Sequence, residues 1–279
     1  MSFNQIAVLG PGLLGGSVGL AVLARELGEV RFWGRSEEKL AEVREAGFLA
    51  SNELAEVVQG ADLVILATPV EFYADLVEKL VAVGGDFLVT DVGSVKGAVE
   101  EGAAQVLRAA GISFVGSHPM AGSERGGFQA AQADLFEGAA CFLCPDEERT
   151  LVAELQCFWE SLGCLVKEVS AAEHDQIVAR ISHLPHALAS VTARVSLRQR
   201  GEGQQGGGGL LDTTRVAAGN PMMWTSIFLE NQEALLTELR RAAEEMATLR
   251  ELLTNQDEEG LVDWLEEAKR LRDGVSHRS

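Results

Sequence analysis

The histidine at position 118 lies in a stretch of small residues that suits catalysis. The sequence there is Gly116-Ser117-His118-Pro119-Met120-Ala121-Gly122-Ser123-Glu124, and the apolar Phe114-Val115 before it is typical of a buried strand. Pro119 has no backbone N–H and is expected to end the strand's hydrogen-bonded ladder, so we predict His118 in a loop at the mouth of that strand. An imidazole titrates near working pH, so His118 could act as a general base. The alternative is a loop histidine that only satisfies neighbouring carbonyl groups.

A glycine-rich sequence follows the first apolar segment. Residues 5–9 predict a strand, and Gly10-Pro11-Gly12-Leu13-Leu14-Gly15 matches G-x-G-x-x-G at the start of a helix predicted over 13–27. In a dinucleotide site Gly10 would make the tight turn, Gly12 would admit the pyrophosphate, and Gly15 would let the helix pack on the strand. The N–H groups of the first helical turn, at Leu13 and Leu14, would face the phosphates. The alternative is a glycine-rich turn that binds nothing.

The residues after the second predicted strand, 30–33, bear on cofactor choice. An Asp or Glu that binds the adenosine ribose is usual here, but this chain has Gly34-Arg35-Ser36. A guanidinium can pair with a 2′-phosphate in bidentate fashion and stack on adenine. Arg35 and Ser36 therefore favour NADP, with NAD still possible. The alternative is a solvated Arg that caps the helix predicted over 37–46.

Two more predicted strands end in residues suited to a ligand. The strand over 63–67 is followed by Thr68-Pro69, and Pro69 ends the ladder where nicotinamide-side loops usually lie. The strand over 87–90 is followed by Asp91 to Gly97, in which the Ser94 hydroxyl could donate to a substrate oxygen. Ser94 could instead cap the helix predicted over 95–110, and the two roles are compatible.

The alternation of strands and helices predicts the fold. Further strands over 114–117, 139–144 and 165–169, with a helix over 147–162, complete a Rossmann-like, doubly wound, mostly parallel α/β sheet. Ser170-Ala171-Ala172-Glu173 is a capping box, and only helical periodicity follows it. We predict a dinucleotide-binding domain over 1–169 and an all-helical substrate and dimerisation domain over 170–279. The glycine run 201–209 is expected to be a flexible loop between two helices.

The helical part carries a second group of candidates. His183 and His186 are three residues apart and could bind a metal, but no third ligand follows at suitable spacing, so we predict no metal and prefer a substrate contact or a packed histidine. Arg215 could bind a substrate carboxylate through its rigid fork, or be an ordinary surface Arg. Trp224 is more typical of a core or an interface. The helix predicted over 224–253 has an apolar stripe, which makes a homodimer plausible.

Composition limits the function classes. The chain has 279 residues, 47% of them hydrophobic, and a formal net charge of −19, which disfavours nucleic acids and anionic membranes as partners. An anionic substrate would therefore need a local cation. Cys141 and Cys144 form a C-x-x-C pair inside a predicted strand, where small core residues are preferred over a redox or metal role. We see neither a membrane-spanning run nor a signal-like opening, and expect a cytoplasmic protein.

Taken in order, these motifs resemble the prephenate dehydrogenase family, with its arogenate and cyclohexadienyl variants, which acts in tyrosine biosynthesis. The resemblance extends from about residue 4 to about residue 270 and rests on five stretches: 10–17, 91–96, 116–124, 182–186 and 212–224. Many relatives carry an Asp where this chain has Gly34-Arg35, which puts a preference for NAD in doubt.

The resemblance implies an oxidative decarboxylation, in which a nicotinamide takes a hydride from C4 of a cyclohexadienol while the ring carboxylate leaves as CO2. His118 resembles the catalytic histidine that polarises or deprotonates the 4-hydroxyl. Ser94 would hold that hydroxyl and orient His118, and Arg215 would bind a substrate carboxylate. Aromatisation drives the reaction, so orientation and one proton acceptor are the main needs.

The resemblance also implies roles around the substrate. His183 would lie in the pocket, Glu124 would gate its entrance, and Trp224 and Gly208 would reach a neighbouring active site across the dimer. Two rival functions remain. A dehydrogenase of the β-hydroxyacid or imine type would use a catalytic Lys on a helix of the second domain, or a different acid; residues 171–210 contain no Lys, which counts against the lysine-based type. A non-catalytic nucleotide-sensing module would not need His118, Ser94 and Arg215 together.

Overall fold

The computed structural model describes residues 3–123, 125–146, 149–199 and 201–275. By its internal contacts the chain forms two compact units, Met1–Asn231 and Gln232–Ser279. A domain boundary at 169/170 stays a prediction. None of the helices in the described ranges is both long and apolar enough to cross a membrane.

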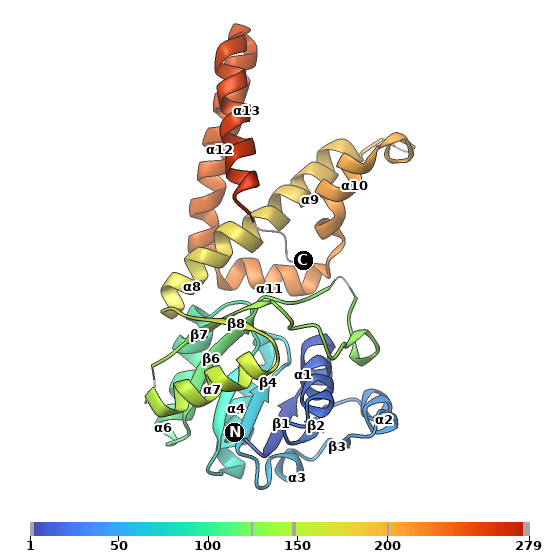
Figure 1. Ribbon diagram of the computed structural model, residues 1–279, viewed down its shortest axis with the longest axis vertical. Helices are drawn as coiled ribbons and strands as arrows, with labels where there is room; N and C mark the ends of the chain where they lie inside the picture. Colours follow the sequence, from blue (N-terminus) through green and yellow to red (C-terminus); the bar gives the residue numbers. More distant parts are fainter. Residues whose placement is uncertain (1–2, 124, 147–148, 200, 276–279) are drawn as a thin grey trace. The chain divides into compact units, whose positions relative to one another are not determined.

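The first unit contains an eight-stranded sheet in the order β3-β2-β1-β4-β5-β6-β7-β8 (Figure 1). Neighbouring strands are parallel except β6 and β7, which are antiparallel, so the predicted mostly parallel α/β fold is confirmed. The strands are β1 Gln5–Leu9, β2 Glu29–Trp33, β3 Leu49–Ser51, β4 Leu63–Leu66, β5 Leu88–Asp91, β6 Phe114–Pro119, β7 Ala140–Cys144 and β8 Leu165–Glu168.

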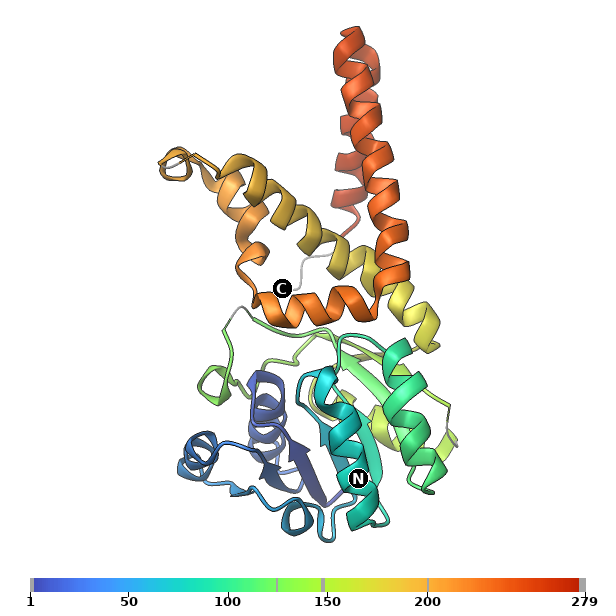
Figure 2. The same cartoon turned by 180° about the vertical axis from the view of Figure 1, so that it is seen from behind.

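Helices cover both faces of the sheet (Figures 1 and 2). Side chains along β1 point alternately to the two faces of the sheet, and both faces are apolar. Ile6 and Val8 pack in the core under α1, α2 and α7, whereas Ala7 and Leu9 pack in the core under α3, α4 and α6. The helices of the sheet-bearing region are α1 Leu13–Ala24, α2 Glu37–Glu45, α3 Leu54–Val58, α4 Tyr73–Val83, α5 Gly97–Val99, α6 Gln105–Ala109 and α7 Arg149–Ser161, with 3-10 turns η1 Val70–Phe72 and η3 Phe128–Ala130 and the π-helical turn η2 Glu100–Ala104.

The remaining helices of this unit follow β8. The helix start predicted at this capping sequence is confirmed, because the Ser170 hydroxyl accepts a hydrogen bond of 3.1 Å from the Glu173 N–H at the start of α8. The segments are α8 Ala171–Val178, the π-helical η4 Ala179–His183, α9 Leu184–Ser196, η5 Glu202–Gln205, α10 Gly208–Thr214, η6 Arg215–Ala218 and α11 Pro221–Glu230.

Four sequence predictions need correction. The short strand β3 and helix α3 were not predicted; β3 is a three-residue edge strand with weak patterning. The glycine run is not all loop, since η5 and the start of α10 lie within it. The helix predicted over 224–253 is two helices, because α11 ends before Asn231, whose buried side chain donates to the Asp175 carbonyl at 2.8 Å.

The fourth correction concerns His118, which lies in β6 rather than in a loop at the mouth of the strand, because β6 extends to Pro119 as its last residue. Past Val115, β6 pairs only with β7. The Met120 N–H donates to the carbonyl of Ala140, the first residue of β7, and the Ser117 N–H points the other way, to Asp91. By this alternation the proline nitrogen faces away from β7, so its missing N–H costs no ladder bond.

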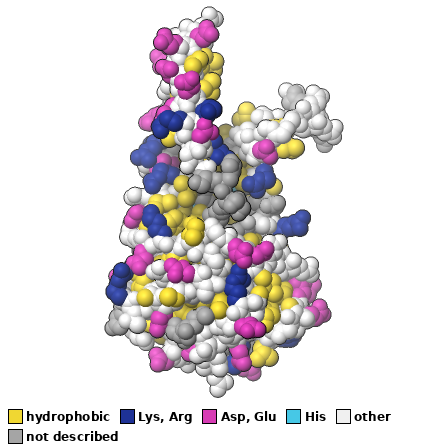
Figure 3. Space-filling view, viewed as in Figure 1, with side chains coloured by type: hydrophobic (Ala, Val, Ile, Leu, Met, Phe, Trp, Pro, Cys, Tyr) yellow, Lys and Arg dark blue, Asp and Glu magenta, His cyan; other side chains and the backbone are white. Residues whose placement is uncertain are grey.

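The second unit is a helical hairpin of α12 Gln232–Asn255 and α13 Glu258–Asp273. The Trp264 Nε1–H donates to Glu245 at 2.9 Å between its two helices. Hydrophobic side chains come to the surface along this hairpin (Figure 3). The exposed large hydrophobic residues on these two helices are Leu236, Met246, Leu253, Val262, Leu265 and Leu271.

Candidate functional site

The glycine-rich turn has the geometry expected of a dinucleotide-binding loop. Gly10 has φ +124°, and a Cβ there would lie 2.7 Å from the Ala67 backbone, so only glycine fits the turn. A Cβ at Gly15 would lie 2.1 Å from the Gly10 oxygen, which explains how α1 packs closely on β1. A Cβ at Gly12 would meet nothing within 4 Å. The open side of the turn therefore leaves space for a phosphate before the first turn of α1.

Arg35 and Ser36 follow β2, at the carboxyl edge of the same sheet. The exposed Arg35 guanidinium stacks over the Phe72 ring, 4.2 Å from its centroid. The Ser36 hydroxyl accepts from the Lys39 N–H at 3.4 Å and caps α2. Ser36, rather than Arg35, is thus the cap of this helix.

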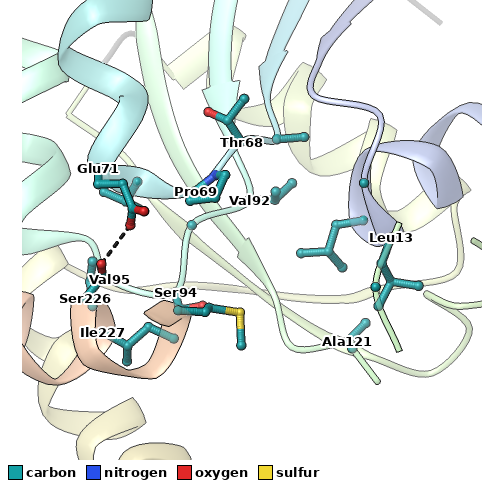
Figure 4. A pocket seen from close by; sticks show the side chains of 18 of the residues that line it. Leu13, Thr68, Pro69, Glu71, Val92, Ser94, Val95, Ala121, Ser226 and Ile227 are labelled. Atoms are coloured by element: carbon teal, nitrogen blue, oxygen red, sulfur yellow. Dashed lines mark hydrogen bonds between the residues drawn. The ribbon is translucent and has the colours of Figure 1, made fainter. Parts of the chain in front are cut away.

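A cavity of about 320 Å³ lies beside the glycine-rich turn. Figure 4 shows its walls: Leu13 on α1, Thr68 and Pro69 after β4, Ser94 after β5, and Ile227 on α11. Of the predicted site residues, those that line the cavity are Gly12, Leu13, Leu14, Thr68, Pro69 and Ser94. The carboxyl ends of β1, β4 and β5 converge here, where open α/β sheets bind ligands.

Several lining residues were missed by sequence reasoning. Glu71 and Ser226 lie side by side in the wall of the cavity, where the serine hydroxyl donates a hydrogen bond of 2.7 Å to the carboxylate (Figure 4). Glu230 and Arg125 also line it. Burial, followed by repulsion from Glu71, raises the pKa of Glu230. No local motif could have revealed these residues, because they come from α11 and from the loops after β4 and β6.

Ser94 stands on a loop held by buried charge. Lys96 and Asp91, both without solvent exposure, form an ion pair beneath it. The Asp91 carboxylate also accepts from the N–H groups of Gly93 at 2.8 Å and Ser117 at 3.0 Å. The N–H groups of Lys96 and Gly97, where α5 begins, donate to Asp175 rather than to Ser94. The Ser94 side chain does not cap this helix.

His118 lies in β6 with only 7% of its surface exposed, and it does not line the described cavity. Its Nδ1 is 2.8 Å from Nε2 of His174, and His174 Nδ1 is 2.8 Å from Asp175 Oδ1. Burial holds the pKa of His118 well below its usual value, and the nearby His174, Lys96 and His183 lower it further. His118 is therefore neutral near pH 7.

The helical histidines form a separate aromatic cluster. The ring of His186 stacks on Trp224, with centroids 3.6 Å apart, and His183 meets the same indole edge-on at 6.2 Å. Burial lowers the pKa of His183 to about 4. Asn231 Nδ2 lies 3.2 Å from His183 Nδ1. Trp224 thus packs within its own unit.

Two predicted substrate residues lie elsewhere. Arg215 is exposed on η6, and Gly208 is exposed at the start of α10; neither lines the described cavity. Glu124 lies outside the described residues. Within the described ranges, no three or more His, Cys, Asp or Glu side chains are grouped to hold a metal ion.

Comparison with known proteins identifies related chains. A family model described as prephenate dehydrogenase, nucleotide-binding domain matches residues 21–168, and one described as prephenate dehydrogenase, dimerization domain matches residues 170–267. A prephenate dehydrogenase of Bacillus subtilis is 33% identical over 99% of this chain and 77% of its own length. A cyclohexadienyl dehydrogenase of Zymomonas mobilis is 32% identical over 97% of this chain and 95% of its own.

A solved structure is also similar. The prephenate dehydrogenase of A. aeolicus, in complex with hydroxyphenyl propionate and NAD+, superposes with a TM-score of 0.91 at 29% identity, covering 99% of each chain.

Proposed function

The chain belongs to the prephenate dehydrogenase family, and we propose from its geometry how its residues serve that family's reaction. The chain is an oxidoreductase that oxidatively decarboxylates prephenate or arogenate, with hydride transfer to a nicotinamide dinucleotide. The observation that carries the site assignment is the shared cavity: the glycine-rich turn and Ser94 line one space at the carboxyl edge of the sheet.

The residues around the turn fit such a cofactor. The space above Gly12 and the N–H groups at the start of α1 suit a pyrophosphate, and Thr68 and Pro69 line the cavity further along the sheet edge. When bound there, the nicotinamide would accept the hydride from C4 of the substrate ring. We propose NADP as the preferred cofactor. The support is the absence of a carboxylate after β2 and the exposed guanidinium of Arg35.

The chain's own chemistry then reduces to orientation and one proton transfer. We propose that the neutral His118 accepts the proton of the 4-hydroxyl, and that the Ser94 hydroxyl orients the same oxygen. Arg215 remains our candidate for a substrate carboxylate and His183 for a pocket residue. The match to a dimerization domain and the apolar side chains on α12 and α13 suggest a homodimer. In such a dimer, Trp224 and Gly208 are our candidates for contacts with a neighbouring site. A cytoplasmic location stays a prediction.

The proposal is tested by following reduced nicotinamide and released CO2 with the purified protein. Prephenate and arogenate are each offered with NAD+ and with NADP+, and 3-hydroxyisobutyrate serves as a β-hydroxyacid control. We expect equimolar reduced cofactor and CO2 with at least one cyclohexadienol. Oxidation of the hydroxyacid alone, or cofactor binding without any turnover, would overturn the proposal.

A further inference from the structure

A continuous chain of hydrogen bonds connects His118 to a carboxylate on another element. It runs from His118 Nδ1 to His174 Nε2 over 2.8 Å, and from His174 Nδ1 to Asp175 Oδ1 over 2.8 Å. His118 lies in β6, whereas His174 and Asp175 lie on α8. All three are buried, with exposures of 7%, 0% and 9%.

The carboxylate fixes where the protons lie. Burial alone would raise the pKa of Asp175, but hydrogen bonds from His174, Lys96 and Gly97 lower it below its usual value, so Asp175 is ionised. An ionised carboxylate only accepts, so His174 Nδ1 must carry the proton. Burial lowers the pKa of His174, which leaves its ring neutral and its Nε2 an acceptor. His118 Nδ1 must then be the donor, and His118 Nε2 is the unprotonated nitrogen.

The same carboxylate also holds the loop that carries Ser94. Asp175 Oδ1 accepts from the Lys96 N–H and Oδ2 from the Gly97 N–H, both at 2.8 Å. A Cβ at Gly97 would lie 2.8 Å from Asp175 Oδ2, so the backbone approaches this carboxylate closely. Asp175 therefore holds the loop after β5 directly and the His118 imidazole in β6 through His174.

We propose that His174 and Asp175 are positioning residues that hold His118 as the Nδ1–H tautomer, with Nε2 available to accept the substrate proton. The assignment of the tautomer stands on the hydrogen bonds together with the ionised Asp175 and the neutral His174; its use in turnover rests on the proposed function. This arrangement orients a base through a second group, as a third residue does in catalytic triads.

The test separates tautomer from activity. Imidazole 15N shifts are recorded on the full-length protein without substrate, and the His118 signals are assigned by their loss in His118→Asn. Wild type is compared with His174→Phe, which removes the acceptor for His118 Nδ1, and with His174→Gln, whose amide oxygen can reach the position of Nε2. Phe142→Leu is the matched control, because Phe142 packs edge-on against His174 at 5.4 Å without a polar contact.

We expect wild-type His118 to show a protonated Nδ1 and an unprotonated Nε2. His174→Phe should lose that preference and lower kcat about tenfold or more, with the KM for substrate and the Kd for cofactor unchanged within about twofold. His174→Gln should keep the tautomer and recover most of kcat, and Phe142→Leu should keep both.

Two results would overturn the proposal: a protonated Nε2 in wild-type His118, or an unchanged tautomer in a folded His174→Phe variant. If the wild-type protein turned over no cyclohexadienol, the proposed function would be wrong. The 15N shifts would still test the tautomer, because they are recorded without substrate.

Discussion

The ammonium of Lys96 and the carboxylate of Asp91 form an ion pair in which neither side chain reaches solvent. The pair lies under the loop that carries Ser94, and Asp91 also binds the Ser117 N–H next to His118. Removing one partner of a buried pair leaves an uncompensated charge. We expect Lys96→Met to lower the free energy of unfolding by about 3–5 kcal/mol in urea denaturation.

The matched control is Lys79→Met. Lys79 forms an exposed i,i+4 pair with Asp75 at 2.8 Å, and its loss should cost less than about 1 kcal/mol. A similar loss of unfolding free energy in the two variants would show that the buried pair stabilises the fold no more than the exposed pair does.

Removing the imidazole of His118 should stop proton acceptance without emptying the cofactor site. We expect His118→Asn to lower kcat on the order of a hundredfold, as the loss of a general base does. Cofactor affinity should stay near the wild-type value, because the glycine-rich turn is untouched. Steady-state kinetics and cofactor titration measure the two. Wild-type turnover in the folded variant would exclude His118 as the base.

Arg35 should govern cofactor choice. We expect the wild-type protein to prefer NADP. Arg35→Ala should lower kcat/KM for NADP by the equivalent of about 1.5–3 kcal/mol, which is what a hydrogen bond to a charged group contributes. The same substitution should hardly change kcat/KM for NAD. Lys39→Ala removes one exposed charge from α2 and serves as the control. Adding Gly34→Asp should move preference further toward NAD. Its Cβ would lie 3.2 Å from Leu40 and Pro11, so its folding must be checked. Wild-type preference for NAD would contradict the prediction.

Arg215 should act on substrate binding alone if it meets a substrate carboxylate. We expect Arg215→Ala to raise the KM for prephenate strongly, with kcat and the KM for the nicotinamide nearly unchanged. Arg215→Lys should rescue only partly, because it lacks the planar fork. Arg194→Ala removes another exposed guanidinium, on α9, and is the control. Equal effects on both ligands, or none, would mean a structural role.

The buried histidines should make the fold sensitive to acid. Burial lowers the pKa of His183 from 6.5 to about 4, so between these values the unfolded chain binds more protons than the folded one. This contribution to stability is complete above pH 6.5 and is lost as the pH falls toward 4. For His183 alone the loss between pH 7.5 and 5 is about 2 kcal/mol.

Urea denaturation at the two pH values, in wild type and in His183→Gln, isolates this contribution from that of the many carboxylates. The variant should lose less stability on acidification than wild type. Equal losses would mean that His183 titrates normally in the folded protein.

Local pattern alone predicted the first strand and the first helix of this protein. The strand over 5–9 and the helix from Leu13 are confirmed, because side-chain alternation and helix starts depend on neighbours in sequence. The capping box at Ser170 was equally local. The same local reasoning was wrong about the strand around Pro119. A proline fits in β6 because its nitrogen lies on the side of the strand that has no neighbouring strand beyond Val115.

Only the tertiary structure brought together His118, His174 and Asp175. His118 and His174 are 56 positions apart along the chain. Nothing in the sequence around either residue predicts the hydrogen bond between them. The same holds for Asp175 and the Lys96 N–H, 79 positions apart, and for Glu71 and Ser226, 155 apart. A buried polar group must find a partner wherever the closed fold offers one, and that partner is fixed by how α8 and α11 pack against the sheet edge rather than by the residues beside it in sequence.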